Sequence, residues 1–286
     1  MEFKYRGVSF GGRTGQIIVT GFDPGAADLN SQDADRPQGD GVLPGKDFFR
    51  GRTWAFDLVT NAKSLEGTLA ADRPLAAAWA AEEIRLNPGR TEALQYLLDG
   101  RWRRVYGRPG RYQGPKGDVR AKQGVGQITA DFRVMDPLYY DETEKVVVLN
   151  IVPGGTGGLI APLVTPLTTL RSGAVRAGLI TNTGDAPTPL TVVFHGPVTN
   201  PWVRATAGWE IGLTGTLAYD ETVTVDARAR TVTRNTGTSA PGMLTRATQL
   251  TASRLPVGSS EVTFGGADPT GTAYAELRWR PASTSI

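Results

Sequence analysis

One histidine and no cysteine leave this sequence few ways to do chemistry. Without cysteine there is no disulfide framework, no thiolate nucleophile and no Cys-ligated zinc or iron–sulfur site. A single imidazole, His195, cannot build a multi-histidine metal site. A catalytic histidine also needs a nucleophile, and no G-x-S-x-G elbow supplies one. We therefore expect a hydrogen-bonded structural role for His195, and we expect neither a metal nor a cofactor.

Carboxylates in the second half are the remaining candidates for catalysis. A carboxylate pair can hydrolyse a glycosidic bond, and Glu210 and Glu276 are expected in strands that could place both on one sheet face. Asp220, Glu221 and Asp226 are further candidates. Acidic residues on a solvent-facing strand need no catalytic role, so we expect no enzyme. A glycoside hydrolase would require hydrolysis that Glu210→Gln or Glu276→Gln abolishes.

Three aromatic residues, Trp202, Trp209 and Tyr219, could form a platform on which sugar rings stack. Aromatic residues also fill β cores, and the core is their more frequent place. A carbohydrate-binding module that recognises cell-surface glycans is therefore the alternative function. It predicts saturable glycan binding that Trp202→Ala or Trp209→Ala removes.

Basic and aromatic residues alternate between Arg101 and Arg111. In a strand this alternation places Arg101 and Arg103 on one face, with Trp102 and Arg104 on the other. Such charges keep a solvated hairpin edge soluble. Alternatively, they form a positive wall that faces nucleic acid or an acidic neighbouring protein. Both interpretations stay open, and the first is modestly favoured.

Composition limits the fold class and the partners. The chain has 286 residues, of which 36 are glycine and 19 are proline, and both residues weaken helix interiors. With 40% hydrophobic and 21% charged residues it can form real cores. A net charge of +3 does not imply dedicated duplex binding. No 18-residue apolar stretch and no signal-peptide centre are present, so we expect a protein made in the cytoplasm with no membrane contact.

The elements that position these residues are mostly short strands. In the first half, strands are predicted at residues 16–20, 54–59 and 127–134, and Asp99 with Gly100 predicts a type I′ hairpin within residues 94–107. Residues 23–38 are predicted to be an extended, mobile polar loop.

One helix is predicted over residues 72–84. Asp72 would cap it, Pro74 would lie in its first turn, and Leu75, Trp79 and Leu86 would share a stripe. The simplest role for this helix is to plug one open end of a β-barrel.

The second half is predicted to be wholly β, which indicates a sandwich or jelly roll. Its predicted strands lie at residues 190–194, 209–213, 222–226, 230–233, 262–264 and 274–279.

Composition changes near residue 140, and we place the domain boundary there. A charged stretch at residues 141–144 precedes an apolar strand at residues 146–152 and a glycine-rich run at residues 154–158. No Lys-Ser/Thr and no amphipathic helix follow the glycines, so they match neither a P-loop nor a dinucleotide fingerprint. We predict a flexible linker there, with domains at residues 1–140 and 141–286.

The order of turn motifs along the chain resembles one known family. In the first half these motifs are RPQGDG at 36–41, GKD at 45–47, GRT at 51–53, LLDGR at 97–101, VYGRP at 105–109 and FRVMDPLYY at 132–140. In the second half they are NTG at 182–184, Pro187, FHGP at 194–197, NP at 200–201, Asp226, RTV at 230–232 and LPVG at 255–258.

Together these motifs resemble the distal tail proteins, or minor tail proteins, of long-tailed non-contractile bacteriophages. The resemblance implies an all-β fold with one helix, in which a split β-barrel-like N-terminal domain precedes a galectin-like β-sandwich. It also implies a structural virion protein without enzymatic activity, assembled in the host cytoplasm. Six N-terminal domains would form a ring that joins the tail tube to the tail-tip or baseplate proteins and lets DNA pass through its lumen.

The resemblance also suggests where such a ring makes contact. Arg101, Arg103 and Arg108 are candidates for the lumen wall. Exposed aromatic residues beside arginine are typical interface anchors, so the interface candidates are Phe48, Phe49, Arg50 and Arg52. A core role for both phenylalanines is equally compatible with the sequence. The alternative function remains an adhesion protein that recognises host-surface glycans.

Overall fold

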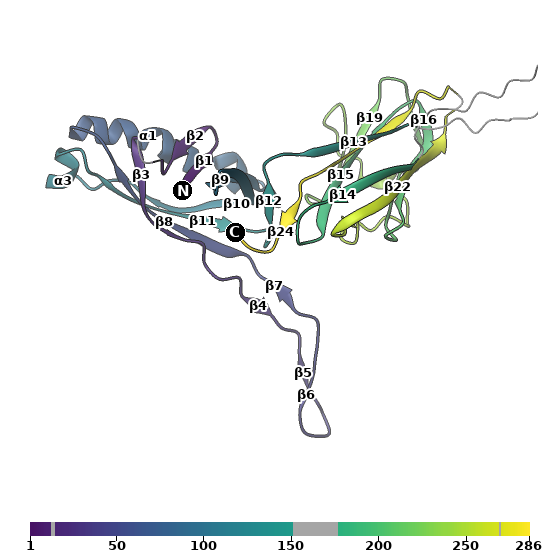
Figure 1. The fold of residues 1–286 in the computed structure, drawn as a ribbon, viewed down its shortest axis with the longest axis horizontal. Helices are drawn as coiled ribbons and strands as arrows, with labels where there is room; N and C mark the ends of the chain where they lie inside the picture. The colour runs from purple at the N-terminus through teal and green to yellow at the C-terminus, as the bar shows by residue number, and fades with distance from the viewer. Residues whose placement is uncertain (13–14, 151–176, 269) are drawn as a thin grey trace, which may run out of the picture. The chain divides into compact units, whose positions relative to one another are not determined.

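The structure is a computed structural model that describes residues 1–12, 15–150, 177–268 and 270–286. Strands dominate these ranges, with one long helix among them (Figure 1). The described residues form two compact units: unit 1 is Met1–Glu142 with Thr284–Ile286, and unit 2 is Thr143–Ser283. The predicted linker at residues 154–158 lies outside the described residues.

Unit 1 is built on one antiparallel sheet in the order β2-β1-β9-β10-β11-β8-β3, and β12 pairs with β10. The two end strands, β2 and β3, are also in contact, as in a split barrel. The strands are β1 (Glu2–Tyr5), β2 (Val8–Phe10), β3 (Ile17–Asp23), β4 (Leu29–Asn30), β5 (Ala34–Asp35), β6 (Val42–Leu43), β7 (Phe48–Phe49), β8 (Arg52–Thr60), β9 (Glu92–Leu98), β10 (Arg101–Gln113), β11 (Gln127–Val134) and β12 (Tyr139–Asp141).

The predicted hairpin and strands of the first half are confirmed. Asp99 and Gly100 connect β9 to β10 with φ angles of 49° and 73°, the positive values that a type I′ turn requires. On β8 the side chains of Trp54, Phe56 and Leu58 are all buried, as period-two alternation predicts. They belong to an aromatic-rich core made by Phe3, Tyr5, Phe10, Trp54, Phe56, Trp79, Tyr96, Phe132 and Tyr139, with Phe22 packed against it.

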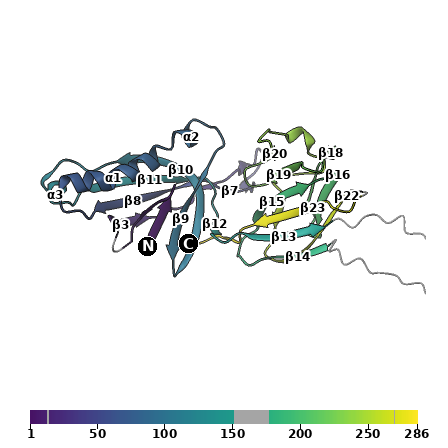
Figure 2. The ribbon, with the colours of Figure 1, turned by 90° about the horizontal axis from the view of Figure 1, so that it is seen from above.

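The long helix α1 (Leu65–Ala80) packs against this sheet (Figure 2) but begins about two turns before the predicted start. Its cap is Ser64, whose Oγ accepts a hydrogen bond from the Gly67 N–H at 3.1 Å. Asp72 lies inside the helix and instead accepts a hydrogen bond from the Tyr112 hydroxyl at 2.7 Å. The predicted cap and start were therefore wrong, because the serine cap lies beyond the alanine-rich run that marked the helix.

The stripe predicted for this helix is partly confirmed. Leu75 and Trp79 are buried in the core of unit 1, whereas Leu86 is 68% exposed and follows the helix. Ala81 ends α1 with a left-handed φ of 35°, and two single-turn helices occur elsewhere in the unit. These short helices are α2 (Glu82–Arg85) and α3 (Val119–Lys122).

Gly107 allows β10 and β11 to approach closely. A Cβ atom at this position would lie 2.1 Å from the Arg133 carbonyl oxygen and 2.7 Å from Cε1 of Phe132. Because the strands would have to separate, we expect Gly107→Ala to destabilise unit 1 by about 1–3 kcal/mol in urea unfolding. Gly117 has nothing within 4 Å of its Cβ position. Gly117→Ala is therefore the control, and equal effects of the two substitutions would contradict the prediction.

Unit 2 is a β-sandwich of two antiparallel sheets. One has the order β13-β23-β15-β19-β20 with β21 paired to β15, and the other has the order β14-β22-β16-β17 with β18 paired to β16. The elements are β13 (Lys145–Asn150), β14 (Ala177–Asn182), β15 (Thr188–His195), β16 (Val198–Ala205), β17 (Glu210–Gly212), β18 (Thr216–Leu217), β19 (Thr222–Asp226), β20 (Thr231–Arg234), the 3-10 turn η1 (Pro241–Met243), β21 (Arg254–Leu255), β22 (Gly258–Ala267), β23 (Tyr274–Trp279) and β24 (Ala282–Ser283).

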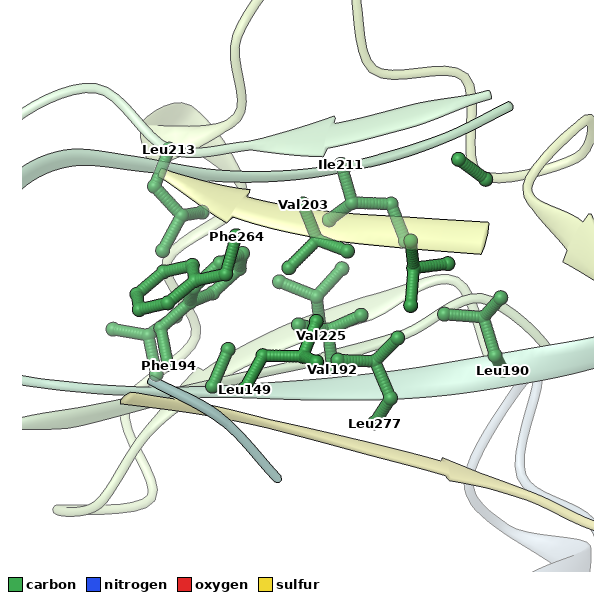
Figure 3. Packing of buried hydrophobic residues seen from close by; sticks show 14 of the residues in the cluster. Leu149, Leu190, Val192, Phe194, Val203, Ile211, Leu213, Val225, Phe264 and Leu277 are labelled. Carbon is green, nitrogen blue, oxygen red and sulfur yellow. The ribbon is translucent and has the colours of Figure 1, made fainter. Parts of the chain in front are cut away.

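Side chains from the two sheets of unit 2 meet in one hydrophobic core (Figure 3). Leu190, Val192 and Phe194 alternate along β15 and are all buried. Phe264 of the other sheet packs against Phe194 with ring centroids 6.2 Å apart. The predicted sandwich is thus confirmed. No helix within the described ranges is long and apolar enough to span a membrane.

Candidate assembly surface

An extended hairpin of residues 24–51, which we call the arm, connects β3 to β8 (Figure 1). Its two strands pair twice, first as β4 with β7 and then as β5 with β6. Residues 23–38 were predicted to be an extended, mobile loop; Asp23 ends β3, and the residues after it form one side of this paired hairpin. The prediction missed the pairing because each ladder has only two residues per strand, too few for a period-two pattern.

The arm exposes apolar side chains on both of its faces. Leu29 lies directly opposite Phe49 in the ladder, and Phe48 lies opposite Asn30, so the two phenylalanines point to opposite faces. Phe48 is 53% exposed and Phe49 is 63% exposed. Neither belongs to the core of unit 1. Of the two roles that the sequence allowed, the structure therefore places both phenylalanines on the surface.

Polar contacts within the arm hold its two strands together. The Arg50 N–H donates to the Asp28 carbonyl at 2.8 Å, and the Arg50 guanidinium donates to Asn30 Oδ1 at 3.0 Å. Farther along, the Gly45 N–H donates to Asp33 Oδ1 at 2.7 Å. The side-chain contact with Ser31 and this backbone N–H lower the pKa of Asp33. Arg50 is therefore a brace within the arm as well as an interface candidate.

Arg52 is held within unit 1 at the base of the arm. Its Nη2 donates to the Pro137 carbonyl at 2.5 Å, and its guanidinium carbon lies 4.3 Å from the centroid of the Tyr139 ring. These contacts fix the position of Arg52, the first residue of β8, and they use its guanidinium group within unit 1. Arg52 thus differs from Phe48 and Phe49, which the arm carries outward.

A two-stranded hairpin by itself is marginally stable in water, and exposed apolar residues on both faces add to its instability. Leu29, Val42 and Leu43 are also about half exposed. A second protein surface that covers both faces would bury all of these side chains together. The arm is therefore the strongest candidate assembly surface within the described residues.

The three arginines proposed for a lumen do not lie on one face of β10. In the β9–β10 ladder, Arg103 pairs with the buried Tyr96, so Arg101 and Arg103 share the core-facing side of the sheet. Arg108 falls on the opposite side by alternation. Its guanidinium donates to the Arg90 carbonyl at 2.7 Å and the Asn87 carbonyl at 2.9 Å. Arg108 therefore anchors the loop before β9.

The proposed tryptophan platform is not assembled in unit 2. Trp209 is only 6% exposed and lies in the hydrophobic core, so its ring offers no face to a sugar. Trp202 is half-buried, and its indole lies so close to β22 that a Cβ on Gly265 would come within 2.3 Å of it. The Arg204 guanidinium lies 4.9 Å from the centroid of the same ring. Of the two places that the sequence allowed for Trp209, the structure shows the core.

Glu210 and Glu276 do not form a carboxylate pair. Glu210 lies in β17 and Glu276 in β23, which belong to different sheets of the sandwich. Glu210 accepts hydrogen bonds from Arg204 at 2.6 and 2.9 Å, and Glu276 is bound by Arg278. The shared sheet face that the sequence allowed is therefore not formed. Among the described residues, no group of three or more His, Asp or Glu side chains gathers as metal ligands would.

His195 is held mainly by packing. Its ring stacks on Tyr274 with centroids 4.1 Å apart, and its buried Nε2 lies 3.3 Å from Glu276 Oε1 without hydrogen-bond alignment. Burial lowers the pKa of His195, and this effect outweighs the attraction of the Glu276 carboxylate. The neutral imidazole is thus the form that the folded chain favours.

We expect the single imidazole to titrate below its ordinary pKa of about 6.5 in a proton NMR titration. Because the unfolded chain then binds the proton more readily, the stabilising contribution is complete above about pH 6.5 and is lost as the pH falls below it. In urea unfolding of unit 2, wild type should lose more stability below pH 6.5 than His195→Gln does. A midpoint at or above 6.5 would contradict this assignment.

No protein-family model matches the sequence, and no curated protein matches it. Solved structures do match. The SPP1 Dit (gp 19.1) protein, described as a paradigm of the hub adsorption apparatus in phages that infect Gram-positive bacteria, aligns with a TM-score of 0.60 and 13% identity over 98% of both chains. A chain of the phage P2 baseplate in its activated conformation aligns with TM-scores of 0.54 with calcium and 0.55 with strontium, at 10% identity over 97% of both chains. These likenesses confirm the predicted fold.

Proposed function

We propose that this chain is a structural hub at the distal end of a phage tail. The observation that carries the proposal is the fold, because the likeness to a phage hub protein spans 98% of both chains and includes both units. Fold alone does not establish function. The proposal is supported separately by the arm, whose exposed apolar residues are typical of a protein-binding surface.

In the proposed hub, six copies form a closed ring through residues 1–140. A ring needs head-to-tail contacts, in which one surface of each copy meets a different surface of the next. The arm supplies the first of these surfaces, with Phe48 and Phe49 as anchors and Arg50 as a brace. Residues 141–286 form the galectin-like domain, which projects from the ring. The ring joins the tail tube to the tail-tip or baseplate proteins, and we propose that it assembles in the host cytoplasm.

The lumen of such a ring has to let DNA slide without holding it. Strong phosphate binding would slow passage, because each neutralised phosphate adds affinity. A net charge of +3 over 286 residues is compatible with weak contact. Arg101, which is exposed beside the β9–β10 turn, is the proposed lumen residue, whereas Arg103 lies opposite the buried Tyr96 and Arg108 anchors the loop before β9.

Light scattering across a range of protein concentrations and salt concentrations tests ring formation. We expect a species about six times the 30.5 kDa mass of one chain, with a central hole in negative-stain images. A protein that stays monomeric throughout, even with its tail-tube and tail-tip partners present, would contradict the hub.

A further inference from the structure

We propose that unit 2 carries a shallow binding site for a neutral saccharide beside Tyr219. The site is a hollow of about 780 Å³ between the turn that precedes β19 and the residues that follow β20. Its lining combines apolar residues, such as Ala218, Ala240 and Met243, with the polar residues Asp220, Glu221, Arg234 and Asn235. It lies wholly within unit 2 and does not depend on ring formation.

Tyr219 lies between two residues that line this hollow, Ala218 and Asp220. The Glu221 N–H donates to the Ala218 carbonyl at 3.1 Å and closes a turn in which Tyr219 is the second residue. The other three residues of the turn line the hollow. Tyr219 is 74% exposed, more than any other large apolar or aromatic side chain in the described part of the chain. The turn that borders the hollow thus carries one exposed aromatic residue.

The polar groups of the hollow are held in place by one another. Arg234 Nη1 lies 2.6 Å from Glu221 Oε1, and Glu221 Oε2 accepts the Ala218 N–H at 3.2 Å. Asn235 Nδ2 donates to the Asp220 carbonyl at 2.8 Å. No described residue engages the Asp220 carboxylate or the Asn235 side-chain oxygen. These contacts fix the framework and leave two acceptors for hydroxyl groups.

The chemistry of the hollow fits a sugar better than other ligands. Two carboxylates accompany one guanidinium, so a polyanion such as nucleic acid would meet net repulsion. The hollow is too open for an apolar small molecule, which requires an enclosed apolar pocket. A pyranose has a C–H face that packs on an aromatic ring and hydroxyls that pair with planar carboxylate and amide groups.

An array printed with bacterial surface polysaccharides and neutral oligosaccharides of glucose, galactose and N-acetylglucosamine tests the site with the full chain. We expect saturable binding to at least one of these glycans, weakened about tenfold or more by Tyr219→Ala and by Asn235→Ala, since each removes a contact. Leu179→Ala is the control, because Leu179 is 70% exposed in the other sheet. Thermal unfolding confirms that each variant is folded.

Two results would overturn the proposal. One is the absence of binding to every glycan on the array. The other is binding that survives Tyr219→Ala and Asn235→Ala but is lost in Trp202→Ala, which would place the sugar on the five-stranded sheet instead. Both readouts are independent of the ring, so loss of sugar binding and loss of assembly are separate outcomes.

Discussion

Replacing Phe56 with alanine should lower the free energy of unfolding of unit 1 by about 3–5 kcal/mol. Phe56 is 1% exposed and lies at the centre of the aromatic core. Its ring contacts those of five neighbours, with centroid distances between 5.0 and 6.3 Å. The substitution removes the buried phenyl ring from the core. It also leaves a cavity, because the neighbouring rings cannot move far enough to fill it. The five neighbours are Phe3, Phe10, Phe22, Trp54 and Trp79.

Urea unfolding followed by near-ultraviolet circular dichroism measures this loss, since the aromatic cluster dominates the signal of unit 1. A loss of this size is a large fraction of the 5–15 kcal/mol that stabilises an ordinary domain. Phe49→Ala is the matched control, because Phe49 is 63% exposed and its truncation should change stability by less than about 0.5 kcal/mol in the monomer. A loss below about 1 kcal/mol for Phe56→Ala would contradict the packing described for this core.

Substituting both phenylalanines of the arm should abolish assembly of the proposed ring and leave the monomer folded. Phe48 and Phe49 point to opposite faces of the arm, so the Phe48→Ser, Phe49→Ser double variant removes an anchor from each face. Truncation of a buried interface anchor costs about 2 kcal/mol, roughly 30-fold in Kd, and two anchors at each interface multiply this effect. Sedimentation velocity of wild type and variant at equal concentrations measures the outcome.

Leu86→Ser provides the control for the arm variant. Leu86 is 68% exposed but lies outside the arm, so it removes comparable apolar surface without touching the proposed contact. We expect Leu86→Ser to assemble as wild type does. A double arm variant that still assembles, with a Kd within threefold of wild type, would show that the ring closes through another surface.

Much of the fold was predictable from the sequence, because turn preferences and strand alternation are visible over short stretches of residues. The Asp99-Gly100 turn was predictable because few residue pairs tolerate two positive φ angles in succession. The strands β8 and β23 were predictable because one face of each is buried, which enforces alternation over several residues. In both cases the pattern that reveals the element lies within a few consecutive residues.

The remaining features depend on contacts between distant parts of the chain. Glu210 and Glu276 are both acidic residues in predicted strands, yet the topology places them in separate sheets. Trp209 and Tyr219 are both aromatic residues near turns, but the first is buried against the sandwich core and the second is exposed. Whether an aromatic side chain is buried depends on which strand packs over it, and no local pattern records that choice.

The residues of the candidate assembly surface were predictable from the sequence, but the arm that carries them was not. An aromatic pair beside Arg50 is a recognisable interface signal, and the structure places both rings on the surface. The arm that carries them was missed because its ladders have only two residues per strand. Arg52 and Arg108 were grouped with functional residues by their charge, whereas their guanidinium groups bind backbone carbonyls within unit 1. A charged residue with such partners cannot be told from a free one by sequence.

The location of the chain in the virion tests the central claim most directly. Gold-labelled antibodies raised against the purified protein should be applied to intact particles of the proposed source, a phage whose genome carries this sequence, and imaged by electron microscopy. We expect gold at the distal end of the tail, where the tube meets the tip, and no label along the tube. Label along the length of the tube, on the capsid, or absent from particles whose tail tips are accessible would contradict the hub.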